Sequence, residues 1–234
     1  GGGEQPLFAY RSGWESKNDT YLAAKGGSAS FSHAHMDAGS FIYEWGGVRW
    51  SIDLGSQNYY SLESKGVDLW NMKEGSQRWQ VFRIGSSSHS TLTVKGKNHL
   101  VGGRAPMTAV YDKPDCYFDL SSLFEELSVA RRTITINDLG HVSVVDTLRS
   151  EQPTVVRWTM CTNADVERLN SRELLLKQQG KSLILRASKG AKAFVLSNEP
   201  PHDYDAPNKG SRRVGFEVKV NKNVVFRVKL LPIG

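Results

Sequence analysis

Two histidines separated by one residue are the first side chains in this chain that could do chemistry. His33 and His35 lie in the segment SHAHMDAGSF of residues 32–41, just before an apolar run. On a β-strand, two residues at this spacing point to the same face, which would place two imidazoles side by side. Zinc sites use three or four N, O or S ligands, so such a pair is a good start for one. Paired surface histidines have the same pattern, so the pair alone leaves both interpretations open.

Asp53 is the second candidate, in the otherwise apolar segment WSIDLG of residues 50–55. An ionised carboxylate beside Ile52 and Leu54 is costly unless it is paired, capped or bound to a metal. The alternative is a structural role, in which Asp53 caps the following turn at Gly55.

His89 is the third candidate, because it enters a strand through a Ser-rich loop.

His35, Asp53 and His89 together form a set of two histidines and a carboxylate, which is typical of zinc chemistry. If all three are ligands, each imidazole should have its second N–H held by another group. Asp37 and Ser90 are the candidates for that role. Cupin metalloenzymes also begin with two histidines at this spacing, but their next ligand is a Glu four or five residues later, where this chain has Gly and Ser.

A β-hairpin is expected to bring these side chains together. Residues 41–45 and 48–52 alternate apolar and polar residues around Gly46-Gly47, a pattern that predicts two antiparallel strands joined by a two-residue turn. The strand that ends near Asp53 then runs back beside the strand that starts after His35, so the two side chains become neighbours.

The rest of the chain also reads as short strands. Residues 132–136 and 141–145 predict a second hairpin around the turn at 137–140. Further strands are expected at residues 155–160, 182–186, 193–197, 214–220 and 224–230. The long irregular insertion at 61–78 is expected to hold a helical turn at 69–72. We therefore predict an all-β, antiparallel β-sandwich forming a single domain of residues 1–234, with the motifs in 7–100 and the remaining strands in 101–234.

Composition narrows the possible partners. With 39% hydrophobic residues the chain has ordinary globular composition, and 30 Lys and Arg against 24 Asp and Glu give a net charge of +6. The excess favours an acidic partner, although scattered charges serve solubility equally well. We find no basic motif interleaved with aromatics, as nucleic-acid readers have, and no stretch near the ~20 apolar residues of a membrane span.

Other features leave alternatives open. Cys116 and Cys161 form either one disulfide or two buried thiols. The chain starts with GGG rather than Met, which indicates a processed or artificial start and leaves export possible. His99, His141 and His202 have no motif around them and are expected to be surface or core residues.

Several motifs in order resemble the heparinase II/III-like family of polysaccharide lyases. They are WE at 14–15, YLAAKGG at 21–27, HAHMDAGSF at 33–41, WSIDLG at 50–55 and HSTLTV at 89–94. The resemblance covers about residues 7–100, and beyond that the sequence is β-rich and compatible.

The resemblance implies a two-part enzyme in which an N-terminal α/α toroid, which this chain lacks, precedes a β-sandwich. It implies that His35, Asp53 and His89 bind a structural zinc or another divalent cation. His33 would face the substrate as a catalytic residue, either neutralising a uronate carboxylate or taking part in proton transfer. The Tyr that serves as acid and base would come from the toroid, so the isolated chain is expected to be inactive.

The implied reaction is β-elimination on uronic-acid-containing glycans of the heparin or heparan sulfate type, in the periplasm or outside the cell. An alginate or oligoalginate lyase of similar architecture is one alternative, and a non-catalytic glycan-binding or domain-docking module with a structural metal is another. Residues in or beside the long insertion are candidates for substrate binding: Tyr60, Trp70, Asn71, Arg78 and Arg83. An Arg suits a sulfate or carboxylate through its planar fork, and ordinary salt bridges explain it equally well.

Overall fold

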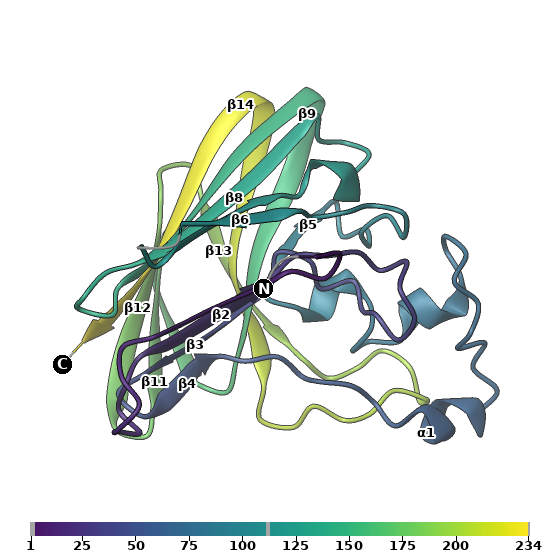
Figure 1. Cartoon of the computed structure of the whole chain (residues 1–234), viewed down its shortest axis with the longest axis horizontal. Coiled ribbons are helices and arrows are strands. Elements are labelled where there is room, and N and C mark those ends of the chain that lie inside the picture. The colour runs from purple at the N-terminus through teal and green to yellow at the C-terminus, as the bar shows by residue number, and fades with distance from the viewer. Residues whose placement is uncertain (1–2, 111–112, 234) are drawn as a thin grey trace.

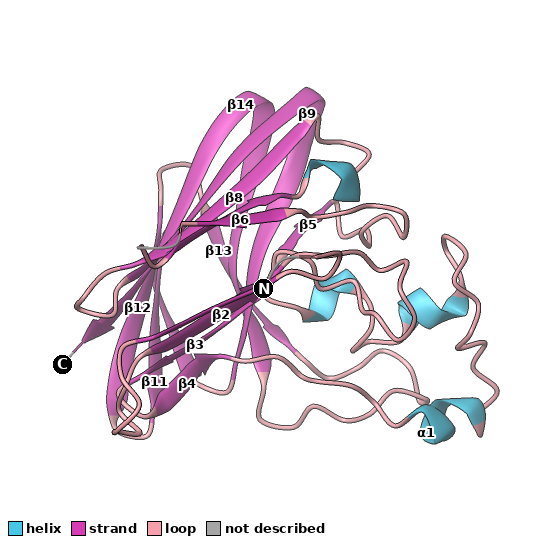
Figure 2. Ribbon diagram, viewed as in Figure 1, coloured by secondary structure: helices cyan, strands magenta, loops and turns pink. Residues whose placement is uncertain are grey.

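The structure is a computed structural model that describes residues 3–110 and 113–233. Strands dominate it and form two antiparallel sheets that pack together, as Figures 1 and 2 show. The predicted all-β, antiparallel fold is therefore confirmed. The predicted single domain of 1–234 includes residues 1, 2, 111, 112 and 234, which lie outside the described residues.

The smaller sheet has the strand order β1-β2-β3-β4. Its strands are β1 (Leu7–Arg11), β2 (Tyr21–Lys25), β3 (Phe41–Trp45) and β4 (Val48–Ser51). The predicted hairpin between β3 and β4 is confirmed. Its turn residues Gly46 and Gly47 both have positive φ, at 61° and 77°, which a residue without a Cβ adopts at little cost.

The larger sheet has the order β10-β11-β12-β14-β9-β8-β7-β6, while β13 pairs with β14 and β5 with β9. Its strands are β5 (Leu92–Val94), β6 (Met107–Ala109), β7 (Asp115–Asp119), β8 (Val129–Ile136), β9 (Val142–Thr162), β10 (Asp165–Asn170), β11 (Glu173–Gln178), β12 (Lys181–Ala187), β13 (Lys192–Ser197) and β14 (Arg212–Ile233).

Two of these strands are much longer than predicted. The strands expected at 141–145 and 155–160 are two halves of β9, and those at 214–220 and 224–230 are two halves of β14. The register between β9 and β14 shifts at Val220/Lys222, which marks an irregularity midway along the pair. Polar residues interrupt the apolar pattern there, although the backbone stays extended. The sequence pattern therefore predicts two short strands where the structure has one long strand.

The core lies between the two sheets and includes a buried ion pair. Phe41 of the small sheet packs on Trp158 of the large one, with ring centroids 5.8 Å apart. The fully buried Arg132 bonds Asp146 at 2.8 Å and also donates to the backbone oxygen of Gly39, at 2.8 Å. This second bond fixes the segment that enters β3, and with it the position of the histidines just upstream.

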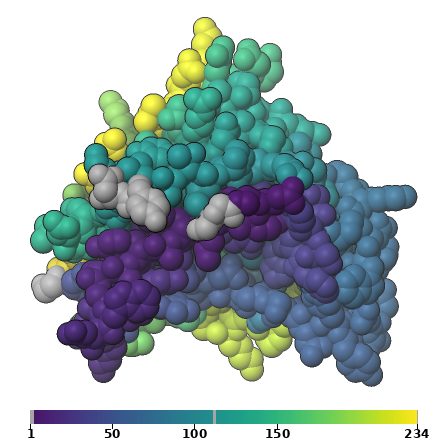
Figure 3. Space-filling model, in the orientation of Figure 1, coloured from purple at the N-terminus to yellow at the C-terminus, as the bar shows by residue number. Residues whose placement is uncertain are grey.

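Loops between β4 and β5 form a lobe beside the sandwich, which makes up one flank of the surface in Figure 3. The lobe contains the short helix α1 (Tyr59–Glu63) and two 3-10 turns, Gln77–Gln80 and Ser86–Ser88; a third 3-10 turn, Ser121–Leu123, follows β7. The helical turn predicted at 69–72 is wrong. Helix starts at 59 because Asn58 caps it, its side chain accepting the N–H of Ser61 at 3.2 Å. A second apolar cluster, which includes Leu62 and Trp79, gives the lobe its own core.

Cys116 and Cys161 are both buried and both free, so of the two alternatives the structure has thiols and not a disulfide. Burial raises the pKa of each thiol to about 12. In the described part of the chain, no helix has the length and apolar character needed to cross a membrane.

Candidate functional site

The end of β4 is attached to the large sheet, and this attachment brings Asp53 to His89. The N–H of Ile52 donates to the backbone oxygen of Cys161 in β9 at 2.9 Å. The N–H of Cys161 in turn donates to the hydroxyl of Ser90 at 3.0 Å. Because Asp53 follows Ile52 and His89 precedes Ser90, one hydrogen-bonded junction places both side chains together.

Asp53 and His89 form a direct hydrogen bond, with 2.8 Å between Oδ2 and Nδ1. The other carboxylate oxygen, Oδ1, accepts the N–H of Gly55 at 2.8 Å. Asp53 therefore caps the turn, as its structural interpretation predicts, and also contacts an imidazole, while its role as a metal ligand stays a prediction. The His89 side chain is completely buried, whereas that of Asp53 is 37% exposed.

His35 lies next to His89, with 5.6 Å between the ring centroids. Two hydrogen bonds hold the segment that follows His35. The N–H of Met36 donates to the oxygen of Ile84 at 2.8 Å, and the hydroxyl of Thr91 donates to the oxygen of Ala38 at 2.7 Å. The sequence prediction that three separate segments converge here is thus met for the contacts His35–His89 and Asp53–His89.

His33 does not share a strand face with His35, and that expectation is wrong. Residues 32 and 33 lie in a turn, residues 34 and 35 are irregular, and β3 begins only at residue 41. His33 has a φ of 62°, in the left-handed region, and this reversal sends the two imidazoles to different neighbours. The ring of His33 stacks on Tyr59 at 5.6 Å and meets Trp70 edge-on at 5.6 Å.

The charges of the three inner side chains are coupled. Burial, and then the charge of His89, lower the pKa of His35 to about 4. Burial alone would lower the pKa of His89, but the charge and hydrogen bond of Asp53 raise it above its ordinary value. Burial would raise the pKa of Asp53, yet His89 and the N–H of Gly55 hold it well below its usual range. At neutral pH His35 is thus neutral and Asp53 ionised, as metal ligands need to be. The raised pKa of His89 instead favours its protonated form, which must lose the proton on Nε2 before that nitrogen can bind a cation.

Whether these residues fit a zinc ion rests on their donor atoms. Within residues 3–110 and 113–233, no three His, Cys, Asp or Glu side chains already stand in a geometry that would hold a metal ion. The Nε2 atom of His89, however, is buried and has no hydrogen-bond partner in that part of the chain. An orphaned imidazole nitrogen beside His35 and Asp53 fits a cation in donor type, and zinc stays a prediction.

The residues expected to hold the free imidazole N–H groups do something else. Asp37 forms an ion pair with Lys25, at 2.8 Å, and the hydroxyl of Ser90 accepts the N–H of Cys161. Neither residue bonds an imidazole among the described residues, and their role around a bound metal stays a prediction. Asp53 itself takes the role at His89, an arrangement in which a carboxylate orients an imidazole and leaves Nε2 as the ligand.

Sequence reasoning missed Tyr59, which completes an aromatic cluster around His33. Tyr59 and Trp70 meet edge-on, with 5.4 Å between ring centroids, and the indole N–H of Trp70 donates to Glu63 at 2.7 Å. The neighbouring Tyr60, chosen from the sequence, is 77% exposed and takes no part in this cluster. Only the orientation of α1 distinguishes the two tyrosines, and no sequence signal gives it.

The predicted substrate-binding arginines lie in structural positions. Arg78 is completely buried and donates to the backbone oxygens of Leu69, at 3.0 Å, and Ala34, at 2.9 Å. Arg83 donates to Asn208 at 2.8 Å and to two loop carbonyls. These contacts are hydrogen bonds to loop oxygens and not salt bridges, and they favour a structural role in which each arginine holds loops together. Direct contact of either arginine with substrate stays a prediction, and the positions of the two side chains argue against it.

Asn71 also makes local contacts. Its amide N–H donates to Asp68 at 2.9 Å, and its side-chain oxygen accepts the N–H of Lys73 at 3.1 Å. Trp70, at 54% exposed, is the predicted residue of this loop that is both accessible and in contact with His33. Its assignment to substrate stays a prediction, and its position supports it.

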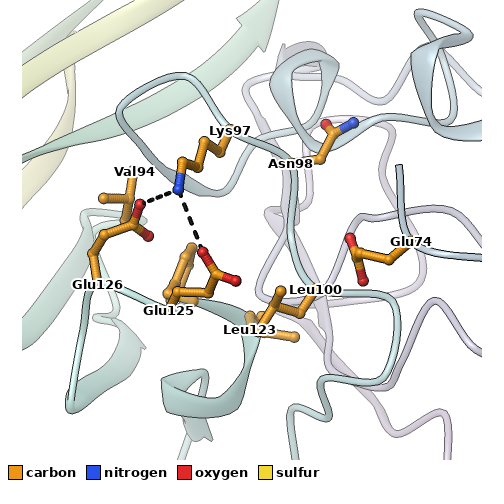
Figure 4. A pocket seen from close by; sticks show the side chains of 9 residues that line it. Glu74, Val94, Lys97, Asn98, Leu100, Leu123, Glu125 and Glu126 are labelled. Atoms are coloured by element: carbon orange, nitrogen blue, oxygen red, sulfur yellow. Dashed lines mark hydrogen bonds and ion pairs between the residues drawn. The ribbon is translucent and has the colours of Figure 1, made fainter. Parts of the chain in front are cut away.

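One surface hollow adjoins the histidine site and another does not. A hollow of about 150 Å³ is lined by Lys25, Asp37 and Asp53, together with part of the small sheet. The hollow in Figure 4 has a different lining, in which Lys97 already bonds Glu125 and Glu126 at 3.4 and 2.8 Å. Its cation is neutralised by these two carboxylates, so we assign it no part in the site.

Comparison with known proteins supports the fold and the family. The solved structures that resemble the chain include a heparinase III gene product with methylated lysines, at TM-score 0.72 and 18% identity over 97% of this chain and 34% of that one. The heparan sulfate lyase HepC from Pedobacter heparinus matches at TM-score 0.73 and 16% identity, over 97% of this chain and 35% of that one. The chain thus spans about a third of the length of these structures.

A search of curated proteins gave no match. The family described as heparinase II/III-like, C-terminal, matches residues 7–224, which is nearly the whole chain and far more than the 7–100 that the motifs covered. The resemblance drawn from the motifs is confirmed, and the chain belongs to the heparinase II/III-like C-terminal family.

Proposed function

We propose that this chain is the β-sandwich part of a polysaccharide lyase that cleaves uronic-acid-containing acidic glycans by β-elimination. One observation carries the proposal: in a chain of this family, the exposed imidazole of His33 lies two residues from His35, which contacts the buried His89 and its hydrogen-bonded partner Asp53. The exposed imidazole can meet an anion, and the buried group can hold its segment in place.

The chemistry of β-elimination explains why such residues are useful. Removal of the proton next to a uronate carboxylate builds negative charge on that carboxylate, which preorganised donors must stabilise. An imidazole N–H of His33 would donate to it, held by its stacking on Tyr59. A base must accept the proton and an acid must protonate the leaving oxygen. We place those two roles in a toroid domain, which makes this chain inactive alone.

The inner residues would position His33 without touching substrate. A zinc or similar divalent cation, when bound, would supply positive charge that links three segments of the chain. His35 would offer its neutral imidazole, Asp53 its carboxylate and His89 its unpartnered Nε2. Because His33 is two residues from His35, rigidity at His35 limits the motion of His33.

The substrate class follows from the named relatives and from charge. The similar structures include a heparinase III and a heparan sulfate lyase, and the net charge of +6 suits an acidic glycan. We therefore propose a heparin- or heparan sulfate-like substrate, degraded in the periplasm or outside the cell, with an alginate-like polyuronate as the alternative.

Elemental analysis of purified protein tests the metal. We expect about one zinc or other divalent ion per chain, and loss of it in His35→Ala and in Asp53→Ala. His33→Ala is the matched control and should keep the metal, because His33 contacts aromatic rings and not the inner group. Stoichiometric metal in all three variants would remove the proposed ligands, and loss only in His33→Ala would mean that the two histidines have exchanged roles.

Ultraviolet absorbance tests the lyase assignment, because elimination leaves an unsaturated uronate. The isolated chain incubated with heparin, heparan sulfate and alginate should give no rise, whereas a protein that joins this chain to a toroid domain should. A sustained rise with the isolated chain would show that it is complete as an enzyme.

A non-catalytic glycan-binding or docking module is the second candidate function. It is favoured by the exposed rings of Tyr60 and Trp70, at 77% and 54%, on the lobe beside His33. Such a module would bind glycan or a partner domain, but His33→Ala in the two-domain protein would leave the elimination rate unchanged. If His33→Ala instead lowers the elimination rate at least a hundredfold while glycan binding is retained, the result favours the lyase role.

A further inference from the structure

A further hollow lies away from His33, His35 and His89, on the outer face of the large sheet. It has a volume of about 460 Å³ and is formed by β12, the C-terminal half of β14 and the turn before β9. Figure 1 shows that β12 and the C-terminal end of β14 lie on the opposite side of the molecule from α1. We call it the basic hollow and define it by its polar lining residues: His141, Arg186, Ser188, Arg227 and Lys229.

The three cations of the basic hollow stand on one face of two paired strands. Arg186 of β12 and Lys229 of β14 are direct partners across the strands. Arg227 is two residues before Lys229 and so points to the same side. All three are exposed, while Val228 and Leu230, which alternate with them, are fully buried in the core.

Carboxylates balance only one of these charges. The Nε atom of Arg186 lies 2.5 Å from Glu173 on the next strand. The side chains of Arg227 and Lys229 have no acidic partner among residues 3–110 and 113–233. Like charges directly opposite each other destabilise a sheet. The hollow in Figure 4 is the contrast, because there two glutamates neutralise Lys97.

The backbone holds these charges at fixed spacing. Residues two apart on a strand are about 6.7 Å apart, and opposite residues about 5 Å, so three cations occupy a patch one or two sugar units wide. Two hydrogen bonds pin the patch, from the N–H of Ser188 to the oxygen of Arg227 at 2.8 Å and from the N–H of Arg227 to the hydroxyl of Ser188 at 3.1 Å. Leu231 adds an apolar surface to the lining.

We infer that the basic hollow is a second, non-catalytic binding site for a segment of acidic polysaccharide, whose sulfate or carboxylate groups pair with Arg227 and Lys229. Guanidinium groups bind such oxyanions with two parallel hydrogen bonds, and an anion between Lys229 and Arg186 relieves their repulsion. The choice of a glycan as ligand rests on the proposed function. The site itself is separate from His33, His35 and His89 and needs neither metal nor elimination chemistry.

Equilibrium binding of size-defined heparin to the whole chain tests the inference, in about 0.15 M NaCl. The double variant Arg227→Gln/Lys229→Gln should weaken binding about tenfold. The matched control is Lys192→Gln/Lys219→Gln, which also removes two positive charges, but from exposed positions elsewhere on β13 and β14. This variant should weaken binding less than twofold. Equal weakening by both variants would mean that net charge alone acts, and no weakening by the first would overturn the site.

A measurement on the unaltered protein guards against misfolding of a variant. Heparin should slow acetylation of the Lys229 amine by a water-soluble reagent at least threefold, and leave Lys192 unchanged. Unsulfated polyuronate in the same assay shows whether carboxylates suffice, and protection by double-stranded DNA at equal strength would overturn a glycan-specific site. Heparin binding and lysine acetylation are measured separately from metal content and elimination activity. The proposed function can therefore be contradicted while the binding site is supported, and the binding site can be contradicted while the proposed function is supported.

Discussion

The two ends of the candidate site are built from the same residue type in opposite ways. At the inner end, His89 is completely buried and its partner Asp53 is fixed by a second hydrogen bond to Gly55. At the outer end, His33 lies in an exposed turn and contacts the rings of Tyr59 and Trp70. The His89 side chain at the inner end is shielded from water and contacts protein groups. The exposed ring of His33 at the outer end can exchange its aromatic contacts for contacts with a ligand.

This difference indicates a division of labour between stability and binding. A buried hydrogen-bonded pair is costly to break, because removal of one partner leaves the other poorly solvated. Exposed ring contacts are worth about 1 kcal/mol or less. If the two ends are independent, substitutions at one should change stability and substitutions at the other should change ligand binding.

His89→Ala should have the largest effect on stability. It removes a fully buried side chain, leaves a cavity and deprives Asp53 of its partner, so we expect the free energy of unfolding to fall by about 4 kcal/mol. Urea unfolding measured in the presence of a chelator isolates this loss from any metal contribution. A loss below about 1 kcal/mol would show that the inner end does not support the fold.

Acidification should separate the effect of burial from that of a carboxylate partner. His99 is as buried as His89 but bonds only the oxygen of Leu92, and burial lowers its pKa to about 4. Its neutral form thus stabilises the fold above the ordinary pKa of about 6.5, and this contribution is lost as the pH falls toward 4, by about 3 kcal/mol. For His89 the sign is opposite: its pKa is raised, so its contribution is lost as the pH rises.

Chemical unfolding at pH 8 and pH 4 measures the first loss. His99→Phe is the control. Because its ring has no titrating nitrogen, the free energy of unfolding of this variant should fall between pH 8 and pH 4 by about 3 kcal/mol less than that of the wild type. Equal acid sensitivity of wild type and His99→Phe would contradict the assignment. NMR titration of the metal-free protein should show His99 unprotonated down to about pH 4 and His89 protonated well above it.

Asp53→Asn should have an intermediate effect. The amide oxygen can still accept the N–H of Gly55, but the charge beside His89 is lost. Because Asp53 is over a third exposed, solvent screens the pair, and we expect a loss of only about 1 kcal/mol. Asp37→Asn is the matched control, which breaks the partly exposed pair with Lys25 and should cost about 0.5 kcal/mol or less. A greater loss for Asp37→Asn would reverse the ranking of the two carboxylates.

The parts of the fold that the sequence predicted are those with strong local signals. The Gly46-Gly47 turn and the alternation around it defined the β3–β4 hairpin, and apolar runs placed strands in β8, β9, β12, β13 and β14 of the large sheet. β10 was missed because Asp165–Asn170 is a mostly exposed edge strand without apolar alternation. The continuity of β9 was missed because the extended backbone crosses a polar stretch that resembles a turn.

The candidate site was predictable where it depends on pairing of neighbouring strands and unpredictable where loops decide. The hairpin argument placed Asp53 near the start of β3, where it lines one hollow with Ser40 and Phe41. Its junction with His89, however, depends on Cys161, more than a hundred residues later. The burial of Arg78 and the choice of Tyr59 over Tyr60 depend on how the lobe packs. Long-range contacts of irregular backbone leave no periodic trace in the sequence.

His33→Asn should have the smallest effect on stability. Asn tolerates the left-handed backbone at this position, and the lost contacts are exposed ring contacts, so the free energy of unfolding should change by no more than about 0.5 kcal/mol. Metal content should stay at the wild-type level, while the two-domain enzyme should lose activity. A loss above about 1 kcal/mol, or loss of metal, would show that the two ends form one unit. In that case the exposed turn would be part of the scaffold, and its imidazole would not be free to exchange its aromatic contacts for a glycan carboxylate.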